Sequence, residues 1–483
     1  MSTAMTDKDV TELPDDPAQL KNVIRQKLAE IRQLEHHLGL ALKSKYGPRR
    51  EHFDAAQSTL FDLGEVPEPS ATDDTSTDRS ATRRPGHGRR RLPPDLPRKR
   101  VEHDLGEAEK ACPCCGKRRH RIGFDISERL EWKPAEQYVI EHARAKYACP
   151  DCEENVSVAA RFDEPIPRGL GAPGLYAGIT VGKYGDHLPL YRMEEILSRS
   201  GFTIARSTQC DWMRQLAELS RPVVDRMAER IRQGEIIWTD DTTVPVLDRA
   251  QSKTKTGRFW VYIGDREHRY AVFDYTPNRQ RAGPETWLAG WQGYLQADAY
   301  VGYDRLVAGD AVTEVACWAH ARRKFHEARD SARAAASDAL SRIGQLYRLE
   351  KRVGEDDSQA RYEQRQKYAK PALVKFRAWL DDQLPQHVPK SPLGVAMRYT
   401  LSNWQALNEY VENGRLTIDN NLSERTIRCV AIGRKNWMFA GSDNGGRTAA
   451  VHFSLTATCK LIGLDPYRYI RMLYEELPKP SAK

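Results

Sequence analysis

Two adjacent carboxylates, Asp240 and Asp241, lie inside an apolar and β-branched stretch at residues 236–247. This composition predicts a buried strand. A fold tolerates acids in such a place only when a metal, a base or a hydrogen-bond network compensates their charge. We expect a metal ion, and oxygen ligands of this kind favour Mg²⁺ or Mn²⁺ over zinc.

Further elements are predicted after this stretch, namely strands at 259–263 and 270–273, a short helix at 285–289, and strands at 293–300 and 312–318. Three strands, a helix and two more strands make the order of a ribonuclease-H-like core. The first and fourth strands of such a core are neighbours, so Asp240 would meet Asp298. Two carboxylates repel each other, and a pair of Mg²⁺ ions between them would relieve that repulsion and support phosphoryl transfer.

A third carboxylate would complete such a site. Glu424 lies about one turn into a predicted helix whose start is marked by Asp419, Asn420 and Asn421. The same residues also fit a capping box, in which Asn421 and Glu424 only cap their own helix. The residues alone leave both interpretations open.

Cysteines form a second candidate metal site. Cys112 and Cys115 make one Cys-x-x-Cys pair, and Cys149 and Cys152 make another. Four thiolates can bind one tetrahedral Zn²⁺ and leave no open position for catalysis, so this zinc would be structural. Cys114 lies inside the first pair as a spectator or a substitute ligand. Unliganded cysteines in a reduced protein are the alternative.

Composition sets wider bounds. The 483-residue chain carries a formal net charge of +8, which favours a polyanionic partner such as nucleic acid. We found no signal-like segment and no run of about 18 apolar residues, and we therefore expect a cytoplasmic protein. The nine cysteines indicate thiols and metal ligands rather than a disulfide framework.

The front of the chain contains a predicted helix at 20–46 with about three heptads, which fits either a coiled coil or a helix docked on its own protein. A polar linker follows, with five arginines between Arg83 and Arg91 that could lie along phosphates or stay solvated. Helices at 190–199 and 207–219, the second capped by Ser207, outline a helix-turn-helix. Its candidate groove-facing residues are Arg206, Gln209, Arg214 and Gln215; a plain helical bundle fits nearly as well.

Several longer motifs lie in order along the chain: the two cysteine pairs, KYGDHLPLY at 183–191, TDDT at 239–242, LQADAYVGY at 295–303, CWAHARRKF at 317–325, DNNLSER at 419–425, GRKNW at 433–437 and AGS at 440–442. Together they resemble transposases of the insertion-sequence-66 family. The resemblance covers nearly the whole chain except the linker. The first cysteine motif departs from the pattern through the extra thiol of Cys114.

The resemblance implies a DDE transposase whose metal-binding triad is Asp240, Asp298 and Glu424, with Asp241 the runner-up for the first position. It implies Mg²⁺ or Mn²⁺ at the triad, binding to the element's terminal repeats, cleavage of the DNA strand, and strand transfer by the released 3′-hydroxyl. Candidates for holding phosphates around the triad are His320, Arg322, Arg323, Arg434 and Lys435. Expected partners are double-stranded DNA, further copies of the chain and accessory proteins of the same element, with no membrane.

The predicted fold class is a multidomain α+β protein. Its expected parts are an N-terminal helix or coiled coil (1–63), a basic linker (64–100), a zinc-binding domain (101–166), a helix-turn-helix region (167–233), a ribonuclease-H-like catalytic domain (234–440) with a helical insertion (327–414), and a C-terminal helical element (441–483). Two other classes share features with this chain. A zinc-stabilised DNA-binding regulator would need no triad, and a ribonuclease-H-like nuclease would stop at hydrolysis.

Overall fold

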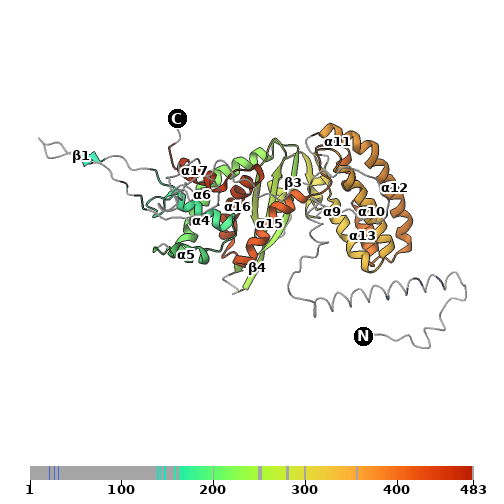
Figure 1. Cartoon of the computed structure of the whole chain (residues 1–483), viewed down its shortest axis with the longest axis horizontal. Coiled ribbons are helices and arrows are strands. Elements are labelled where there is room, and N and C mark those ends of the chain that lie inside the picture. Colours follow the sequence, from blue (N-terminus) through green and yellow to red (C-terminus); the bar gives the residue numbers. More distant parts are fainter. Residues whose placement is uncertain are drawn as a thin grey trace, which may run out of the picture. The chain divides into compact units, whose positions relative to one another are not determined.

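Figure 1 presents the computed structural model of the chain. It describes residues 163–480 with gaps at 200, 249–252, 279–281, 299–300, 310 and 355–356, and also residues 21, 25, 27, 31, 139–140, 142, 146–147 and 157–158. The chain divides into two units, one of residues 1–65 with 141–483 and one of residues 66–140. Only the first unit is considered below, since the second lies outside the described residues except 139 and 140.

Three predictions fall wholly or partly on undescribed residues. The four cysteines predicted to bind zinc and the arginine-rich arm lie outside the described residues. Of the predicted N-terminal helix, the four described residues, Lys21, Arg25, Lys27 and Ile31, are helical. The choice between a coiled coil and a docked helix stays a prediction.

The strands are β1 (Lys146–Tyr147), β2 (Ser157–Val158), β3 (Ile236–Asp248), β4 (Lys253–Gly264), β5 (Ala271–Thr276), β6 (Gly293–Gln296) and β7 (Val312–Val315). β1 and β2 form a small antiparallel pair, and the other five form one mixed sheet in the order β5-β4-β3-β6-β7. β4 runs antiparallel to both β3 and β5, whereas β3, β6 and β7 are parallel. The strands that lead to Asp240 and Asp298 are therefore neighbours, as expected.

The helices before and within the sheet region are α4 (Pro173–Tyr184), α5 (Leu190–Ser198), α6 (Arg206–Ile231), α7 (Ala282–Trp287), α8 (Asp304–Val307) and α9 (Trp318–Glu327). Those after it are α10 (Arg333–Glu350), α11 (Ser358–Gln364), α12 (Lys370–Gln383), α13 (Pro392–Ser402), α14 (Trp404–Asn408), α15 (Asn421–Trp437), α16 (Asp443–Ile462) and α17 (Pro466–Glu476).

Two strands are shorter than predicted. The expected fifth strand at 312–318 ends at Val315, because Cys317 caps α9 and Trp318 begins that helix. The expected fourth strand at 293–300 ends at Gln296. The segment after Val315 stays apolar through Trp318, and an unbroken apolar run gives no signal for where pairing stops.

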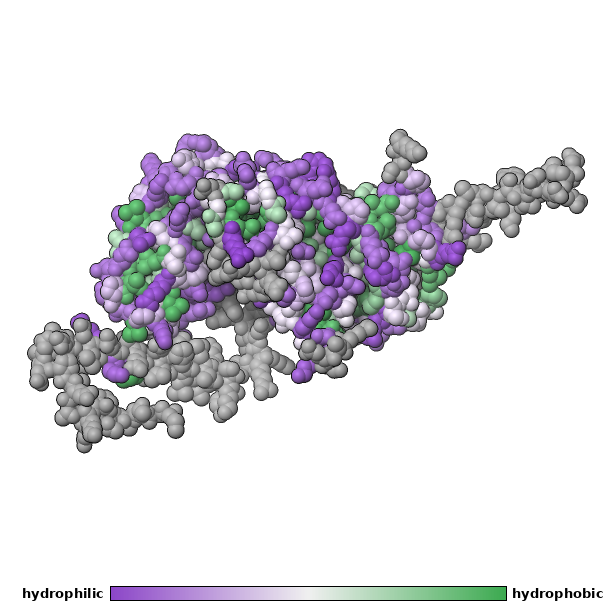
Figure 2. Space-filling view, turned by 180° about the vertical axis from the view of Figure 1, so that it is seen from behind, coloured by the Kyte–Doolittle hydropathy of each residue, from purple (hydrophilic) through white to green (hydrophobic). Residues whose placement is uncertain are grey.

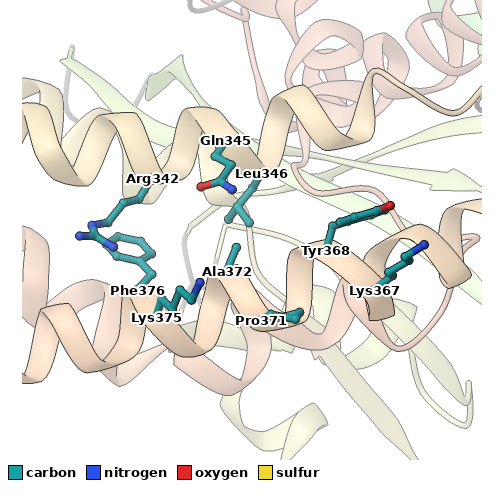
Figure 3. Close-up of a pocket in the computed structure, with 9 residues that line it drawn as sticks. All are labelled: Arg342, Gln345, Leu346, Lys367, Tyr368, Pro371, Ala372, Lys375 and Phe376. Carbon is teal, nitrogen blue, oxygen red and sulfur yellow. The ribbon is translucent and has the colours of Figure 1, made fainter.

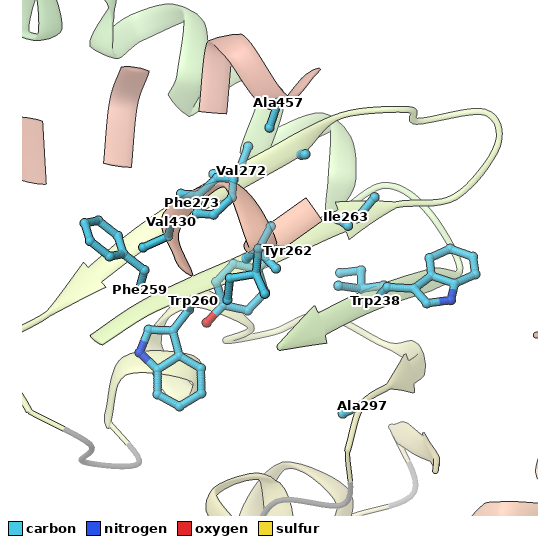
Figure 4. Close-up of a cluster of buried hydrophobic side chains, with 14 of the residues drawn as sticks. Trp238, Phe259, Trp260, Tyr262, Ile263, Val272, Phe273, Ala297, Val430 and Ala457 are labelled. Carbon is cyan, nitrogen blue, oxygen red and sulfur yellow. The ribbon is translucent and has the colours of Figure 1, made fainter. Parts of the chain in front are cut away.

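The core of the described chain is built around the mixed sheet. α15 packs against β3 and β4, and α16 packs against β5 and α6. Figure 4 shows Val430 of α15 close to Phe259, and Ala457 of α16 beside Val272. The predicted C-terminal helical element is thus part of the core, since α16 buries most of its length.

The helix-turn-helix prediction needs two corrections. α6 begins at Arg206 with Ala205 as its N-cap and no side-chain cap bond, so the Ser207 cap is wrong. Gln209 is fully buried and donates to the Ile204 carbonyl at 2.8 Å, so it does not face a groove. Arg206 and Arg214 are exposed, and Arg214 pairs with Asp211 and Glu218 on its own helix. Whether α5 and α6 bind DNA stays a prediction.

The helices α10 to α14 form a group to one side of the sheet, beyond β3 (Figure 1). A groove of about 250 Å³ lies between α10 and α12. Figure 3 shows it lined by the cations Arg342, Lys367 and Lys375 together with the ring of Tyr368. None of the predicted triad residues lines this groove.

The face of the molecule shown in Figure 2 is mainly hydrophilic where described residues are visible, with scattered hydrophobic side chains. Among the described residues, none of the helices is both apolar enough and long enough for a membrane span.

Candidate active site

The register of the two central strands brings the first two predicted acids together. Trp238 of β3 lies opposite Gln296 of β6 in parallel pairing. Asp240 lies two residues after Trp238, and Asp298 lies two residues after Gln296. Because side chains alternate along a strand, we expect both carboxylates on the same face of the sheet, just beyond the end of β6. Their charges interact, since Asp298 raises the pKa of Asp240.

Glu424 reaches the same place from the first turns of α15. Asn420 is the N-cap residue, and the side chain of Asn421 donates to Asp419 rather than capping the helix. The Oε1 atom of Glu424 is buried and accepts no hydrogen bond. The capping-box alternative is therefore wrong, because Glu424 makes neither bond that the motif requires.

Three side-chain bonds hold the start of α15 against the sheet. The Asn420 amide donates to the Thr239 carbonyl of β3 at 2.8 Å. The Gln296 amide at the end of β6 donates to the carbonyls of Thr417 at 2.5 Å and Asp419 at 2.9 Å. Since Thr239 precedes Asp240 and Gln296 lies two residues before Asp298, these bonds fix Glu424 relative to both other acids.

The electrostatics of the three carboxylates are unfavourable. Burial raises the pKa of Asp240 well above its usual range, and the charges of Asp298 and Glu424 raise it further. Burial also raises the pKa of Glu424, with smaller contributions from Asp419 and Asp298, while Arg323 acts in the opposite direction. Three acids that disfavour each other's charge are typical of a site completed by a cation.

A histidine and an arginine of α9 approach the acids without forming a close ion pair with them. The Nδ1 atom of His320 lies 3.7 Å from Glu424 Oε1, and Arg323 Nη2 lies 3.9 Å from Glu424 Oε2. Burial lowers the pKa of His320, and the charge of Arg323 lowers it further. The imidazole is thereby biased toward its neutral form, so Arg323 is the main fixed positive charge beside Glu424.

The other three candidate phosphate ligands have different surroundings. Arg322, on α9, acts electrostatically on Tyr347 of α10. Arg434, on α15, donates to the side chains of Thr242 and Thr243, which ties α15 to β3. Lys435 is exposed. The structure therefore brings His320 and Arg323 to the acids and gives Arg434 an anchoring contact that the sequence analysis did not anticipate.

The two adjacent aspartates have opposite surroundings. Asp241 pairs with Arg258 of β4, and both side chains are largely buried. Asp241 and Arg258 share one face of the sheet, because Asp241 lies opposite Trp260 and Thr243 lies opposite Arg258. Asp240 points to the other face, where its carboxylate accepts from the Asp241 backbone N–H at 2.7 Å.

The residues of this cluster fit a divalent cation. Asp240, Asp298 and Glu424 supply hard oxygen ligands, and the Oε1 atom of Glu424 is buried without a hydrogen-bond donor. Burial and neighbouring carboxylates raise the pKa values of Asp240 and Glu424, as expected for acids that a divalent cation would stabilise in their charged form.

Comparison with known proteins identifies the family. A sequence profile described as "Transposase IS66 family" matches residues 168–448, more than half of the chain. The chain belongs to the IS66 family of transposases. A second profile, "zinc-finger binding domain of transposase IS66", matches residues 109–153 and so spans all four predicted zinc ligands. A third, "Transposase C of IS166 homeodomain", matches residues 33–101.

Relatives of this IS66 transposase family member occur in Sinorhizobium fredii (strain NBRC 101917 / NGR234). The uncharacterized protein y4jD is 31% identical over 490 residues, covering 98% of this chain and 94% of that protein. The uncharacterized protein y4qI is 33% identical over 479 residues, covering 94% and 87%. The uncharacterized protein y4hP is 33% identical over 431 residues, covering 84% and 77%.

Membership in the IS66 family confirms the resemblance inferred from the motifs, and it makes the chain a DNA-processing enzyme by family. The sequence analysis missed three supporting residues, Gln296, Asn420 and Cys317. All three lie inside motifs that were recognised. The polar Gln296 in an apolar strand was the clearest signal, since a buried amide needs a hydrogen-bond partner.

Proposed function

We propose that this chain is the transposase of an insertion sequence and that Asp240, Asp298 and Glu424 form its catalytic triad. The observation that carries the proposal is the convergence of three carboxylates from β3, the segment after β6, and α15, with no closely matched cation among the described residues. The proposed reaction is hydrolysis of a phosphodiester at each end of the element, followed by transesterification into target DNA.

The proposed fold of the catalytic domain is ribonuclease-H-like. Its support is the strand order β5-β4-β3-β6-β7, with an antiparallel β3-β4-β5 meander joined to parallel β6 and β7. In this assignment, the helices α10 to α14 are an insertion between β7 and the helix that carries Glu424. The proposed domain boundaries remain those expected from the sequence.

Asp240, Asp298 and Glu424 would hold Mg²⁺ or Mn²⁺. When bound, such ions neutralise the acids and supply Lewis-acid activation of the attacking and leaving oxygens. The chain's own residues would do the positioning. Arg323, and His320 when protonated, would hold a non-bridging phosphate oxygen of the scissile phosphodiester by charge-assisted hydrogen bonds.

The proposed chemistry has two in-line displacements at phosphorus. Water attacks first and releases a DNA 3′-hydroxyl, and that hydroxyl then attacks a phosphodiester of the target. No protein nucleophile takes part, so no covalent protein–DNA intermediate forms.

DNA recognition is proposed for the front of the chain. The zinc-finger match at 109–153 and the α4 to α6 region would bind the terminal repeats, and the N-terminal helix would pair two copies of the chain. Accessory proteins of the same element are further proposed partners.

A strand-transfer assay tests the function. A duplex carrying the element's end with a pre-cleaved 3′-hydroxyl is incubated with the full chain, Mg²⁺ and a target plasmid. We expect joined products that disappear with Asp240→Asn while end binding persists. Hydrolysis without joining, with accessory proteins present, would indicate a nuclease. Unchanged biological activity in Asp240→Asn would indicate a regulator.

A further inference from the structure

The N-terminal ends of α9 and α15 lie next to each other beside the triad. They carry a second group of potential metal ligands, which shares only Glu424 with the three acids. Cys317 is the N-cap residue of α9, and His320 follows one turn later. Glu424 comes from the first turns of α15. Their ligand atoms, Sγ, Nδ1 and a carboxylate oxygen, all lie within 4.8 Å of one another.

The atoms that face each other in this cluster lack hydrogen bonds. His320 Nδ1 and Glu424 Oε1 are both buried, and neither makes a hydrogen bond. Burying two such polar atoms is unfavourable unless a partner satisfies them. Arg323 approaches the other oxygen, Oε2, which leaves Oε1 directed toward the imidazole at 3.7 Å.

Cys317 belongs to the same arrangement. Its side chain is fully buried, and its Sγ accepts a hydrogen bond from the Asn420 backbone N–H at 3.2 Å. That bond comes from the N-cap residue of α15, so it holds the thiol at the junction of the two helices. A thiol at this position is oriented toward the imidazole and the carboxylate.

The chemistry of this ligand set selects a different ion from the triad. Sulfur and imidazole ligands favour Zn²⁺ over Mg²⁺. Zinc bond lengths of about 2.0–2.3 Å place the ligand atoms of a tetrahedral site roughly 3.3–3.8 Å apart. The His320–Glu424 separation of 3.7 Å already falls in that interval.

We propose that Cys317, His320 and Glu424 form a binding site for Zn²⁺, or a similar thiophilic divalent cation, in addition to the cysteine-rich segment. Binding forms Zn–S, Zn–N and Zn–O bonds and releases the thiol proton to solvent, with no change in oxidation state. A water molecule completes the tetrahedral coordination.

Because Glu424 belongs to both the proposed Zn²⁺ site and the triad, Zn²⁺ binding would affect strand cleavage. This consequence rests on the proposed function. Glu424 cannot serve Zn²⁺ and the Mg²⁺ triad in the same geometry. Zn²⁺ bound to Cys317 and His320 therefore withdraws Glu424 from the triad and inhibits strand cleavage.

Cobalt spectroscopy tests binding independently of activity. Co²⁺ is added to the full chain with its structural zinc in place, and the thiolate-to-cobalt absorption band is compared among the wild type, Cys317→Ser and the matched control Cys459→Ser. Serine keeps an acceptor for the Asn420 N–H, and Cys459 is another buried free cysteine. We expect the band in the wild type and control, and its loss in Cys317→Ser and in His320→Gln. Equal titrations in all four proteins would overturn the proposal.

A cleavage assay then tests the consequence. At fixed Mg²⁺, the cleavage rate of each protein is divided by its own rate without Zn²⁺. On this scale we expect Cys317→Ser to need at least about tenfold more Zn²⁺ than the wild type for half-inhibition, the loss that removal of one ligand predicts. Equal inhibition of both proteins would overturn the shared-ligand model. If no protein cleaves DNA in Mg²⁺, the proposed function fails, whereas the cobalt result still decides whether the site exists.

Discussion

Two largely buried glutamates, Glu350 in the helical insertion and Glu424 beside the sheet, have opposite partners. Glu350 accepts from Arg365 at 2.9 and 2.6 Å and from Arg361 at 3.3 Å. Glu424 lies 3.7 Å from the His320 imidazole and 3.9 Å from the Arg323 guanidinium, and its other charged neighbours are acids. A buried carboxylate matched by a bidentate guanidinium has its charge compensated within the fold. A carboxylate without such a match is suited to an ion from solution.

The Glu350–Arg365 pair also helps to hold the segment that precedes Glu424. Arg365 donates to the carbonyls of Tyr410 at 2.7 Å and Asn413 at 2.8 Å as well as to Glu350. These carbonyls belong to the chain that leads into α15. The compensated pair therefore holds the segment that delivers the uncompensated Glu424.

The largest effect is expected at the acidic cluster. Asp240→Asn should reduce strand cleavage by at least about 10³-fold, since a lost metal ligand removes several kcal/mol of transition-state stabilisation and 1.36 kcal/mol corresponds to tenfold. Without added Mg²⁺, its free energy of unfolding should equal or exceed that of the wild type, because one of three repelling acids is gone. Gel assays and thermal unfolding measure the two effects. Wild-type cleavage by Asp240→Asn would refute the assignment of the first ligand.

Arg365→Met should have the largest effect on stability. It leaves Glu350 with Arg361 alone and should lower the free energy of unfolding by about 3–5 kcal/mol, as for other broken buried pairs. Urea unfolding measures the loss. Arg226→Met, which removes an exposed pair with Glu229, is the control and should cost less than about 1 kcal/mol. Equal losses in both variants would contradict the contrast between Glu350 and Glu424.

Asp241→Asn should mainly lower stability, as Arg365→Met does, and should not abolish cleavage as Asp240→Asn does. It removes the charge that pairs with buried Arg258 and should cost about 3 kcal/mol, the lower end for a broken buried pair, because asparagine keeps one acceptor. Cleavage should persist below the unfolding temperature. Loss of cleavage in a fully folded Asp241→Asn protein, with Asp240→Asn active, would exchange the roles of the two aspartates.

A smaller, pH-dependent effect is expected at His452, a fully buried histidine that makes one ring-nitrogen contact with a backbone carbonyl. Its Nε2 lies 2.8 Å from the Met213 carbonyl and its ring stacks on Tyr184. Burial, together with a smaller contribution from nearby Lys183, lowers its pKa to about 4. In the unfolded state the histidine has its ordinary pKa of about 6.5, so it binds a proton there before it does in the folded state as pH falls. The free energy of unfolding should therefore decrease by about 2 kcal/mol between pH 7 and 5. Unfolding of His452→Gln at several pH values should show a shallower dependence; an unchanged slope would exclude His452 as its source.

Much of the catalytic region could be predicted from the sequence because its signals are local. Apolar and β-branched runs predicted the five strands of the mixed sheet, and the parallel neighbourhood of the strands leading to Asp240 and Asp298 followed from their order. The strand end at Val315, the burial of Gln209 and the cap of α6 could not be predicted. Each of these three features depends on which distant residues pack against the position, and the hydrophobic periodicity of the sequence does not contain that information.

The amino-acid sequence by itself determined the family, and the same long motifs predicted which acids would form the triad. Only the tertiary structure separated Asp240 from Asp241, since a strand directs adjacent side chains to opposite faces and Arg258 lies on one of them. Only the tertiary structure distinguished Glu424 from a helix cap. Its role depends on bonds from Asn420 and Gln296 to segments far away in the chain, and no local pattern encodes those contacts.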